Sequence, residues 1–402
     1  MLPSKTFTNC KEFKKYKIGD LLDIYQRPCK LDPQKKYQLV TVKRRNEGIV
    51  SRGIYKGSDI KTPTQFYIKS GDFLISKRQI VHGACEMVPE EFDEAIVSNE
   101  YTIARGKKNL ILTEYFNLLS KTTFMKKNYF LSSYGIDIEK MVFNLEDWKK
   151  RLVYIPTTEE QAKIVSFFKK FTEKIVVQQE KIDLLKEQKK GLMQKIFSQE
   201  LRFKDAKGRD YPEWTPQKLG NFSERVTRKN SDLITTRPLT ISAQHGLIDQ
   251  AEFFNKTVAS ENLTGYYLLN KGEFAYNKSY SNGYPLGAIK RLDNYEKGAL
   301  STLYICFRTS ENVNSDFLVH YFDSTQWYRE VSLICVEGAR NHGLLNVGVS
   351  DFFDTHHYLP CLEEQFKIAK FFDSINQIIK LNELKLKNLQ VQKQAFMQHL
   401  FI

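Results

Sequence analysis

Five short stretches of this 402-residue chain bring basic, amide and imidazole side chains together in a way that suits contact with a polyanion. Arginine and glutamine can form paired hydrogen bonds with the edges of guanine and adenine, whereas lysine mostly contacts phosphate. We expect these stretches to be loops that leave short strands, because alternating apolar runs and glycines surround them. The candidates for contact with DNA are Lys43, Arg44, Arg45, Arg52, Lys77, Arg78, Gln79 and His82 in the first half of the chain, and Gln244, His245, Asn277, Lys278, Tyr280, Arg340, Asn341 and His342 in the second.

A solvated turn is the alternative interpretation of each stretch, and the distribution of charge bears on the choice. The net charge is +14, with a pI near 9.2, which favours polyanion partners such as nucleic acid. Residues 1–153 hold 28 Lys+Arg against 18 Asp+Glu, a net of +10, whereas residues 205–357 hold 16 against 18, a net of −2. Any contact with DNA in the later block must therefore come from a local basic patch rather than from a general positive field.

The usual sequence patterns for catalysis and metal binding are missing. The chain has no P-loop, no dinucleotide-binding glycine pattern, no nucleophile elbow and no zinc-protease motif. The segment GIDIEK, with Asp137 and Glu139, can be forced into a nuclease pattern, but an exposed turn of mixed charge is the better interpretation. The histidines show no ligand spacing, and His356-His357 is interpreted as structural. We expect no catalytic residue, no metal and no cofactor in this chain.

The composition predicts a globular protein of the cytoplasm. No apolar run approaches the 18 residues of a membrane span, and the first 25 residues lack the apolar core of a signal peptide. The six cysteines are scattered without a Cys-x-x-Cys pair, so we expect free thiols rather than a zinc or redox site.

One long segment occurs twice, 204 residues apart. YIPTTEEQAKIVSFFKK begins at Tyr154 and YLPCLEEQFKIAKFFDS begins at Tyr358. Without a gap, 17 of the 45 positions in 154–198 are identical to those in 358–402. An ungapped repeat of this length is typical of a regular element rather than of a loop.

The spacing of apolar residues identifies the repeated element as a long helix with a heptad stripe. Polar residues interrupt the stripe at matched places, Gln178 with Asn382 and Lys189 with Lys393, and such interruptions can fix register and partner choice. A helix of roughly 60 Å cannot bury this stripe alone, so we expect the two copies to pair as an antiparallel coiled coil. The predicted core residues are Ile164, Phe168, Phe171, Ile175, Ile182, Leu185, Leu192 and Ile196 in the first copy, and Ile368, Phe372, Ile375, Ile379, Leu386, Leu389, Phe396 and Leu400 in the second.

The start of the first helix is also predicted locally. Thr158-Glu-Glu-Gln161 fits a capping box, and Pro156 discourages an earlier start. The second copy has Leu362 at the position of Thr158, so its start is less well specified. An apolar stripe packed on an ordinary core is the alternative to a coiled coil, but two copies with matching interruptions favour pairing.

The blocks before the two helices echo each other more faintly. IKSGDFLISK resembles LNKGEFAYNK, and capped amphipathic helices are predicted to start at Thr113 and Ser315. The predicted fold is α+β, with two globules that are each followed by a long helix and are related by a pseudo-two-fold axis. The predicted domains are 1–153, 205–357 for the globules and 154–204, 358–402 for the helices with their linker.

This arrangement resembles the specificity subunit (HsdS) of Type I restriction–modification systems. The resemblance rests on IPTTEEQAKIVSFF, on the run IDLLKEQKKGLMQKIFS leading into ELRFK, on YPEWTPQKLGNF, and on GARNHGLLNVGVSDF. The first globule departs from the pattern, because Tyr134-Gly135-Ile136 stands where Gly-Ala-Arg is expected.

The resemblance implies a role and a set of partners. Each globule would be a target recognition domain that reads one half of a bipartite site in double-stranded DNA, and the coiled coil would set the gap. Two modification (methyltransferase) subunits would bind S-adenosylmethionine, and restriction (endonuclease and translocase) subunits would use ATP and Mg²⁺, in the bacterial cytoplasm. The chain itself would be non-catalytic.

Two other classes of function stay open at this point. A self-contained restriction and methylation enzyme is opposed by the missing cofactor motif. A coiled-coil scaffold without a DNA role is distinguished by its lack of salt-sensitive binding to duplex DNA.

Overall fold

The computed structural model describes residues 13–254, 262–281, 283–335 and 345–401. By their contacts, the residues form two compact units, one of 1–179 with 384–402 and the other of 180–383. Two long helices, α5 (Thr158–Phe197) and α11 (Leu362–Leu400), each contribute residues to both units. In the described residues no helix is both long and apolar enough to cross a membrane.

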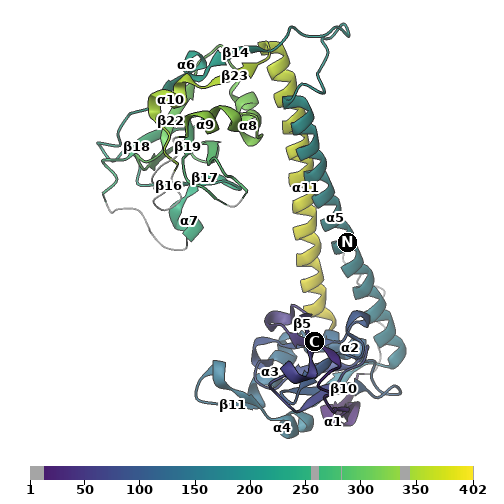
Figure 1. Ribbon diagram of the computed structural model, residues 1–402. Helices are drawn as coiled ribbons and strands as arrows, with labels where there is room; N and C mark the ends of the chain where they lie inside the picture. The colour runs from purple at the N-terminus through teal and green to yellow at the C-terminus, as the bar shows by residue number, and fades with distance from the viewer. Residues whose placement is uncertain (1–12, 255–261, 282, 336–344, 402) are drawn as a thin grey trace. The chain divides into compact units, whose positions relative to one another are not determined.

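The described part of the unit 1 globule has two larger sheets, two two-stranded sheets (β1-β13 and β11-β12) and the short helices α1 to α4 (Figure 1). A five-stranded sheet has the order β3-β6-β9-β4-β5 and a four-stranded sheet has the order β2-β10-β7-β8. Its elements are β1 (Lys14–Lys17), α1 (Ile18–Leu21), β2 (Leu22–Tyr25), β3 (Pro28–Cys29), β4 (Lys36–Val42), β5 (Ile49–Lys56), β6 (Gln65–Tyr67), β7 (Phe73–Ser76), β8 (Cys85–Met87), β9 (Ile96–Ser98), β10 (Tyr101–Gly106), α2 (Thr113–Ser120), α3 (Thr123–Leu131), β11 (Ser133–Tyr134), β12 (Val142–Phe143), α4 (Leu145–Lys150) and β13 (Leu152–Ile155), with 3₁₀ turns η1 (Arg44–Asn46), η2 (Gly57–Asp59), η3 (Ile80–His82), η4 (Glu90–Phe92) and η5 (Ile138–Lys140).

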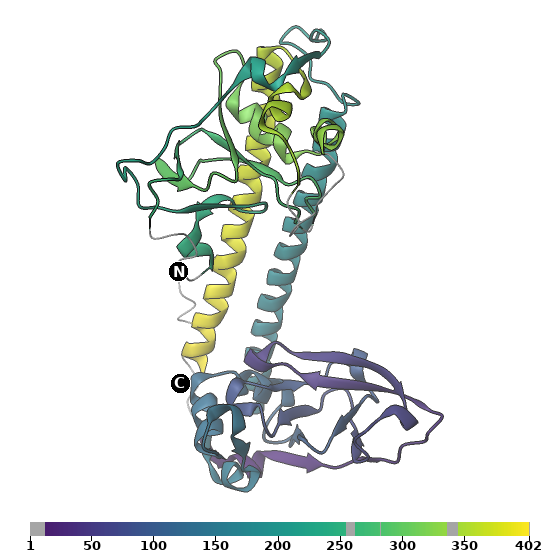
Figure 2. The ribbon, with the colours of Figure 1, turned by 60° about the vertical axis from the view of Figure 1, so that its left-hand side comes forward.

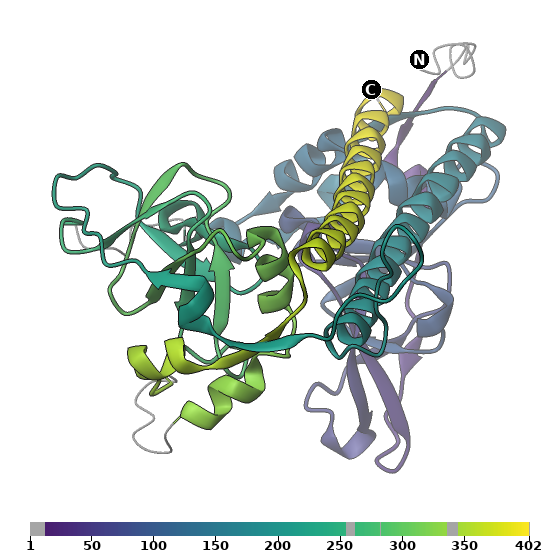
Figure 3. The same ribbon diagram turned by 90° about the horizontal axis from the view of Figure 1, so that it is seen from above.

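The globule of unit 2 repeats much of this plan (green in Figures 1 and 3). The order β15-β22-β19-β20 corresponds to β2-β10-β7-β8, and the pair β14-β23 corresponds to β1-β13. Its elements are β14 (Thr215–Lys218), α6 (Leu219–Phe222), β15 (Ser223–Arg225), β16 (Leu239–Ser242), β17 (Gly246–Asp249), α7 (Gln250–Phe254), β18 (Tyr267–Asn270), β19 (Phe274–Asn277), β20 (Ala288–Arg291), β21 (Lys297–Leu300), β22 (Ile305–Thr309), α8 (Ser315–Asp323), α9 (Tyr328–Ile334), α10 (Val349–Asp354) and β23 (His356–Leu359).

The mixed α+β character predicted from the sequence is confirmed, and α2 and α8 begin at the predicted Thr113 and Ser315. The predicted caps differ, because no described side chain caps α2 and because Asn314 caps α8. The faint echo IKSGDFLISK and LNKGEFAYNK has a structural meaning, because it gives strands β7 and β19 at equivalent places in the two four-stranded sheets. All four residues of β7 are buried. The first three residues of β19 are buried, and its last residue is half-buried.

The start of α5 differs from the predicted capping box. The hydroxyl of Thr157, not that of Thr158, accepts the backbone N–H of Glu160, at 3.4 Å. Gln161 does not reach back to a cap; its side chain accepts the N–H of Leu112 and donates to the carbonyls of Leu110 and Pro156, all at 2.9 Å. Buried amides are normally satisfied in this way, so the glutamine fastens the helix to the loop before α2 instead of closing its own first turn.

The same fastening occurs at the start of α11. The buried side chain of Gln365 accepts the N–H of Asn314 at 2.8 Å and donates to the carbonyl of Pro360 at 2.8 Å. Asn314 is the residue that caps α8, the counterpart of α2. The glutamine of the repeated segment, Gln161 or Gln365, therefore joins each long helix to its own globule by hydrogen bonds.

In both units the ends of the two long helices complete the core of the globule. In unit 1 Phe168 of α5 lies 6.2 Å, between ring centroids, from Phe401, the residue after α11. In unit 2 Phe372 of α11 stacks at 5.9 Å on Phe197, the last residue of α5. Adding 204 to Phe168 and Phe197 gives Phe372 and Phe401, so the same two positions of the repeat meet in both units.

His357 is a structural histidine, as the sequence indicates, and it makes the stability of unit 2 depend on pH. Its imidazole is buried between the Tyr321 hydroxyl at 3.0 Å and the Thr355 hydroxyl at 2.9 Å. Burial, with a smaller contribution from the charge of His356, lowers its pKa to about 4. A group whose pKa is depressed in the folded state stabilises above its unfolded value, roughly 6.5, and loses this contribution as the pH falls toward 4.

We therefore predict that lowering the pH from 7 to 4.5 costs the wild type about 2–3 kcal/mol more in free energy of unfolding than it costs the variant His357→Gln, at 1.36 kcal/mol per pKa unit. Denaturant unfolding at the two pH values measures this difference. The exposed neighbour provides the matched control, since His356→Gln removes only the smaller electrostatic contribution and should keep most of the wild-type pH dependence. An identical pH dependence in wild type and His357→Gln would contradict the prediction.

Candidate nucleic-acid interface

Two of the predicted loops in the globule of unit 1 lie next to each other. Lys43 precedes η1, which contains Arg44 and Arg45, and His82 ends η3. The N–H of Asn46 donates to the carbonyl of Gly83 at 3.0 Å, which joins the two loops through their backbones. Lys43, Arg44, Arg45, Lys77, Arg78, Gln79 and His82 thus belong to a pair of adjoining loops, which we call the paired loops.

Glu139, in η5, contacts the paired loops and was not predicted from the sequence. Its carboxylate binds Arg44 at 2.7 Å and lies 3.4 Å from the imidazole of His82. Glu139 belongs to the segment GIDIEK, and in the structure its carboxylate is the ion partner of Arg44. Only the mixed charge of that segment hinted at it, because the partners are 95 and 57 residues away along the chain.

The remaining charges of the paired loops divide into paired and available groups. Lys77 donates to the carbonyl of Asn99 at 2.6 Å, and Arg78 binds the carboxylate of Glu100 at 2.8 Å. Arg45 is exposed, has a left-handed φ of 59° and forms no ion pair with a described residue. A cation without an acidic partner can contact phosphate without first losing an ion pair, so Arg45 is the best placed of these arginines.

Arg52 lies on β5, one of the long strands of the β4–β5 hairpin (purple in Figure 2), and not in the paired loops. Residues Leu39 and Val40 of β4 pair with Gly53 and Ser51, which leaves Arg52 without a partner in the ladder. Arg52 is therefore the extra residue of a β-bulge. Bulges redirect side chains and are frequent beside functional sites.

The structure places the candidates of unit 2 on two separate segments. Gln244 and His245 are exposed at the turn between β16 and β17. Asn277 ends β19, Lys278 contacts the carbonyl of Val347 at 3.4 Å, and Tyr280 is exposed. No hydrogen bond or ion pair joins these two segments among the described residues. Arg340, Asn341 and His342 lie outside the described residues.

All twenty positions of the heptad stripe are buried or half-buried, including the four polar interruptions. Burial lowers the pKa of both stripe lysines, Lys189 and Lys393. The ammonium of Lys393 donates to the Thr172 hydroxyl at 2.8 Å, within unit 1. Pairing of the two helices along their full length remains a prediction.

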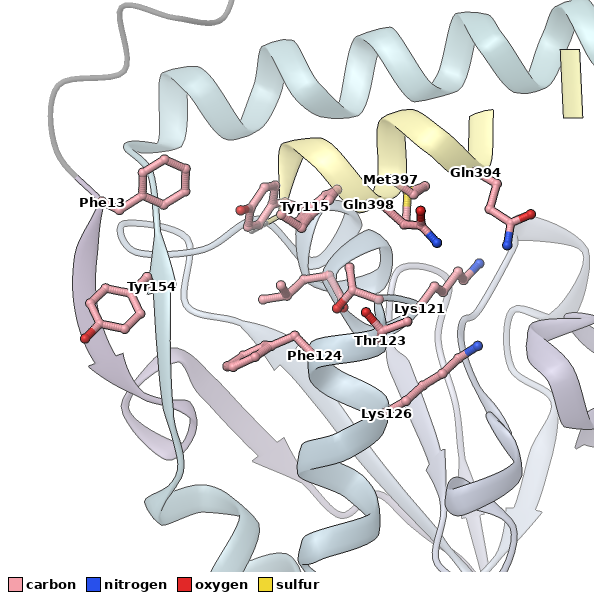
Figure 4. Close-up of a pocket in the computed structure, with 13 residues that line it drawn as sticks. Phe13, Tyr115, Lys121, Thr123, Phe124, Lys126, Tyr154, Gln394, Met397 and Gln398 are labelled. Atoms are coloured by element: carbon pink, nitrogen blue, oxygen red, sulfur yellow. The ribbon is translucent and has the colours of Figure 1, made fainter. Parts of the chain in front are cut away.

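Unit 1 also has an apolar cavity of about 300 Å³ that none of the predicted site residues line (Figure 4). Tyr115 and Phe124 come from α2 and α3, and Gln394, Met397 and Gln398 come from α11. Lys121 and Lys126 supply its positive charge. The cavity is therefore a feature of the joint between helix and globule rather than part of the paired loops.

The described residues contain no group of three or more His, Cys, Asp or Glu that could hold a metal ion. The cysteines Cys29, Cys85, Cys306, Cys335 and Cys361 are free thiols. Burial raises the pKa of the Cys85 and Cys306 thiols to about 12, so neither is a thiolate near neutral pH.

Comparison with known proteins identifies residues 10–187 as a match to the family described as the Type I restriction modification DNA specificity domain. The whole chain is similar in fold to solved structures. The HsdS subunit from Thermoanaerobacter tengcongensis is 16% identical with a TM-score of 0.56, and the alignment covers 97% of each chain. The S subunit of the Type I system from M. genitalium is 14% identical with a TM-score of 0.51, covering 100% of this chain and 99% of that one.

A third similar chain comes from a structure described as showing complex assembly and conformational transition of the type I R-M system. It is 15% identical with a TM-score of 0.59, and the alignment covers 97% of this chain and 98% of that chain. At these identities the likeness establishes the fold. The resemblance drawn from the sequence is confirmed by the family match together with this fold.

The paired loops lead to a prediction for Arg44→Ala combined with Arg45→Ala. Because each lost phosphate contact lowers the salt slope of binding by about one, the double variant should bind DNA more weakly and with a slope smaller by roughly one to two. The measurement is DNA binding by the assembled methyltransferase over a range of salt concentrations. We expect Arg45→Ala alone to cause most of the loss, because Glu139 partly neutralises Arg44.

The double variant Lys126→Ala with Lys127→Ala is the control. It removes the same charge from exposed positions of α3 in the same globule, outside the paired loops themselves. Equal weakening by both double variants would mean that the general positive field matters and the loops do not. Unchanged affinity of the arginine variant at physiological salt would remove the paired loops from the interface.

Proposed function

We propose, from the membership of residues 10–187 in the Type I restriction modification DNA specificity family, that this chain is the DNA-recognition subunit of a Type I restriction–modification complex. The family match is the observation that carries the proposal. The globule of residues 205–357 repeats the four-stranded sheet and strand pair of the globule of residues 1–153, which supports two readers of one design. Each reads one half of a bipartite site, and neither catalyses a reaction.

The helices 154–204 and 358–402 act as the spacer between the readers, in the form of an antiparallel coiled coil. Two sets of contacts, each within one unit, support this. In unit 1 the residues that follow Phe168 along α5 meet earlier residues of α11, since Phe171 lies 5.7 Å from Phe396. In unit 2 Lys186 binds Glu383 at 2.7 Å while Phe197 stacks on Phe372. In both units the numbering of one helix rises as that of the other falls.

The repetition of contacts supports the pseudo-two-fold axis. Phe168 with Phe401 and Phe372 with Phe197 are the same pair of repeat positions. A two-fold pair of readers suits a duplex whose backbone is itself two-fold symmetric.

Exposed apolar residues on the long helices support docking of partner subunits. Val177 is 63% exposed and Leu381 is 58% exposed, and they occupy the same position of the repeat. Clustered exposed apolar side chains are typical of interaction surfaces. Further exposed members are Val176, Leu184, Ile378, Leu384 and Val391. We assign this surface to two modification subunits, one per helix copy; these subunits bind S-adenosylmethionine, and restriction subunits that use ATP and Mg²⁺ join the complex.

Methylome sequencing of a host that expresses this chain with its modification subunit tests the proposed function. We expect methylated adenines within a bipartite sequence, with one constant gap between its halves. The same host with the modification subunit alone is the control and should lack the modified sites. Modification that is independent of this chain, or that follows no common sequence, would contradict the proposal.

Lengthening both helices tests the spacer. The boundaries between the units fall after Gln179 and after Glu383, which are matched and exposed positions of the repeat. Four residues inserted at both places should lengthen the spacer by about 6 Å, close to two base-pair steps. The measurement is the gap in the methylome.

A seven-residue insertion at the same places is the control for helix phase, because it preserves the heptad stripe while adding about 10.5 Å, or roughly three base-pair steps. Retention of the original gap by variants that still methylate would refute the spacer.

A further inference from the structure

A second cavity lies on the five-stranded sheet of unit 1, beside the bulge at Arg52. Its volume is about 260 Å³, slightly below the range of roughly 300–1,000 Å³ usual for whole small-molecule ligands, so it suits a fragment the size of one nucleobase. Exposed Arg52 and Lys61 stand at its rim. The side chains around it come from β4, β5, β6 and β9 and from the segment after η2.

Gln65 lines this cavity and carries a hydrogen-bond acceptor that has no partner among the described residues. Gln65 is only 4% exposed, and its amide nitrogen donates to the carbonyl of Thr62 at 2.9 Å. Its oxygen Oε1 is buried and has no hydrogen-bond partner among the described residues. Leaving a buried polar atom unpaired usually costs free energy, so such an atom in a cavity points to a ligand that donates a hydrogen bond.

The wall of the cavity is held in place by the bulge. The hydroxyl of Tyr55 donates to the carbonyl of Arg52 at 2.8 Å. Gly53 has a φ of 115°, and a Cβ added there would meet the Tyr55 ring at 3.1 Å. A glycine is thus needed both for the bulge and for the close approach of the ring. The opposite surface is apolar, with Leu39, Val40 and Ile60.

We propose that this cavity receives a single base that is unstacked from the target duplex, and that Gln65 reads it. The exocyclic amine of adenine, cytosine or guanine donates to Gln65 Oε1, the ring lies along Tyr55, and Arg52 with Lys61 contact the neighbouring phosphates. Extruded bases are recognised by hydrogen bonds to their edges and by contact with aromatic or apolar side chains. Asp59 is also at the rim, so the phosphates approach on the side of the two cations.

This inference rests on the proposed function and adds a base other than the methylated adenine, which the modification subunit would extrude. It also gives Arg52 a role that differs from that of the paired loops. The bulge aims Arg52 at the cavity, whereas Arg45 is exposed in η1.

The test uses the full chain assembled with its modification subunits and a duplex whose half-sites come from the methylome. Each purine of the first half-site is replaced in turn by 2-aminopurine and each cytosine by pyrrolocytosine, because both fluoresce more strongly when unstacked. We expect a several-fold rise at one position besides the methylated adenine. Tyr55→Ala should abolish this rise and keep the rise at the methylated adenine, because it removes the ring along which the extruded base lies.

Affinity provides the second readout. Gln65→Leu should bind the natural site roughly tenfold more weakly, the size of a single mismatch. It should match the wild type on a duplex whose base at that position lacks the exocyclic amine. Gln38→Leu is the matched control, a half-buried glutamine on β4 outside the cavity, and should leave both readouts unchanged. Tyr55→Ala alters an exposed side chain, so it keeps the test valid should Gln65→Leu fail to fold.

Two results would overturn the inference while leaving the proposed function intact. One is a bipartite methylome with no unstacked base besides the methylated adenine. The other is an unstacked base whose signal survives Tyr55→Ala, together with unchanged affinity of Gln65→Leu for the natural site. A methylome without a bipartite site would overturn the proposed function and the inference together.

Discussion

The structure depends on the burial of two apolar helix ends by each globule. A stripe that runs along a helix of 40 residues cannot be buried by the helix itself, and the globules are too small to cover all of it. In unit 1 Phe168 and Phe401 join the core that contains Trp148, and in unit 2 Phe197 and Phe372 join the core that contains Trp327. Each globule therefore needs both long helices. This requirement explains why the two helices keep similar sequences while the sequences of the globules differ.

Identical residues of the repeat have different surroundings in the two units. Glu364 is fully buried and accepts hydrogen bonds from Arg202 at 2.9 Å and from the indole of Trp214 at 3.1 Å. Its repeat counterpart Glu160 only meets Lys163, one turn away, at 3.3 Å. A buried carboxylate needs such partners, because removing one would leave an uncompensated charge. The linker that supplies Arg202 and Trp214 thus makes Glu364 a buried anchor, whereas Glu160 is half-buried.

Local and periodic signals in the sequence were sufficient for much of the fold. Each position that the step of 3 and 4 residues selects on the two helices is buried or half-buried, and α2 and α8 begin at the predicted residues. The features that escaped depend on contacts between distant segments. The bulge at Arg52 exists only in the register of β5 against β4, and Glu139 meets Arg44 across 95 residues. The role of Gln161 escaped because a glutamine at that position also fits a capping box, and only the position of Leu112 decides between the two.

The stripe lysines illustrate why a costly residue can persist at a shielded position. Lys393 lies beside the ion pair of Lys121 with Glu86, and Lys189 lies beside the ion pair of Lys290 with Asp323. Desolvation lowers the pKa of both lysines, which means that their charged forms are less stable there than in water. An apolar side chain would avoid this cost, but it would pack equally well one turn along the helix. Asp323 opposes the effect of desolvation on Lys189, and Lys393 donates to the Thr172 hydroxyl. Such specific partners exist in one register only, so each interruption favours that register. For a spacer between two readers, that register matters more than the free energy that a leucine would add.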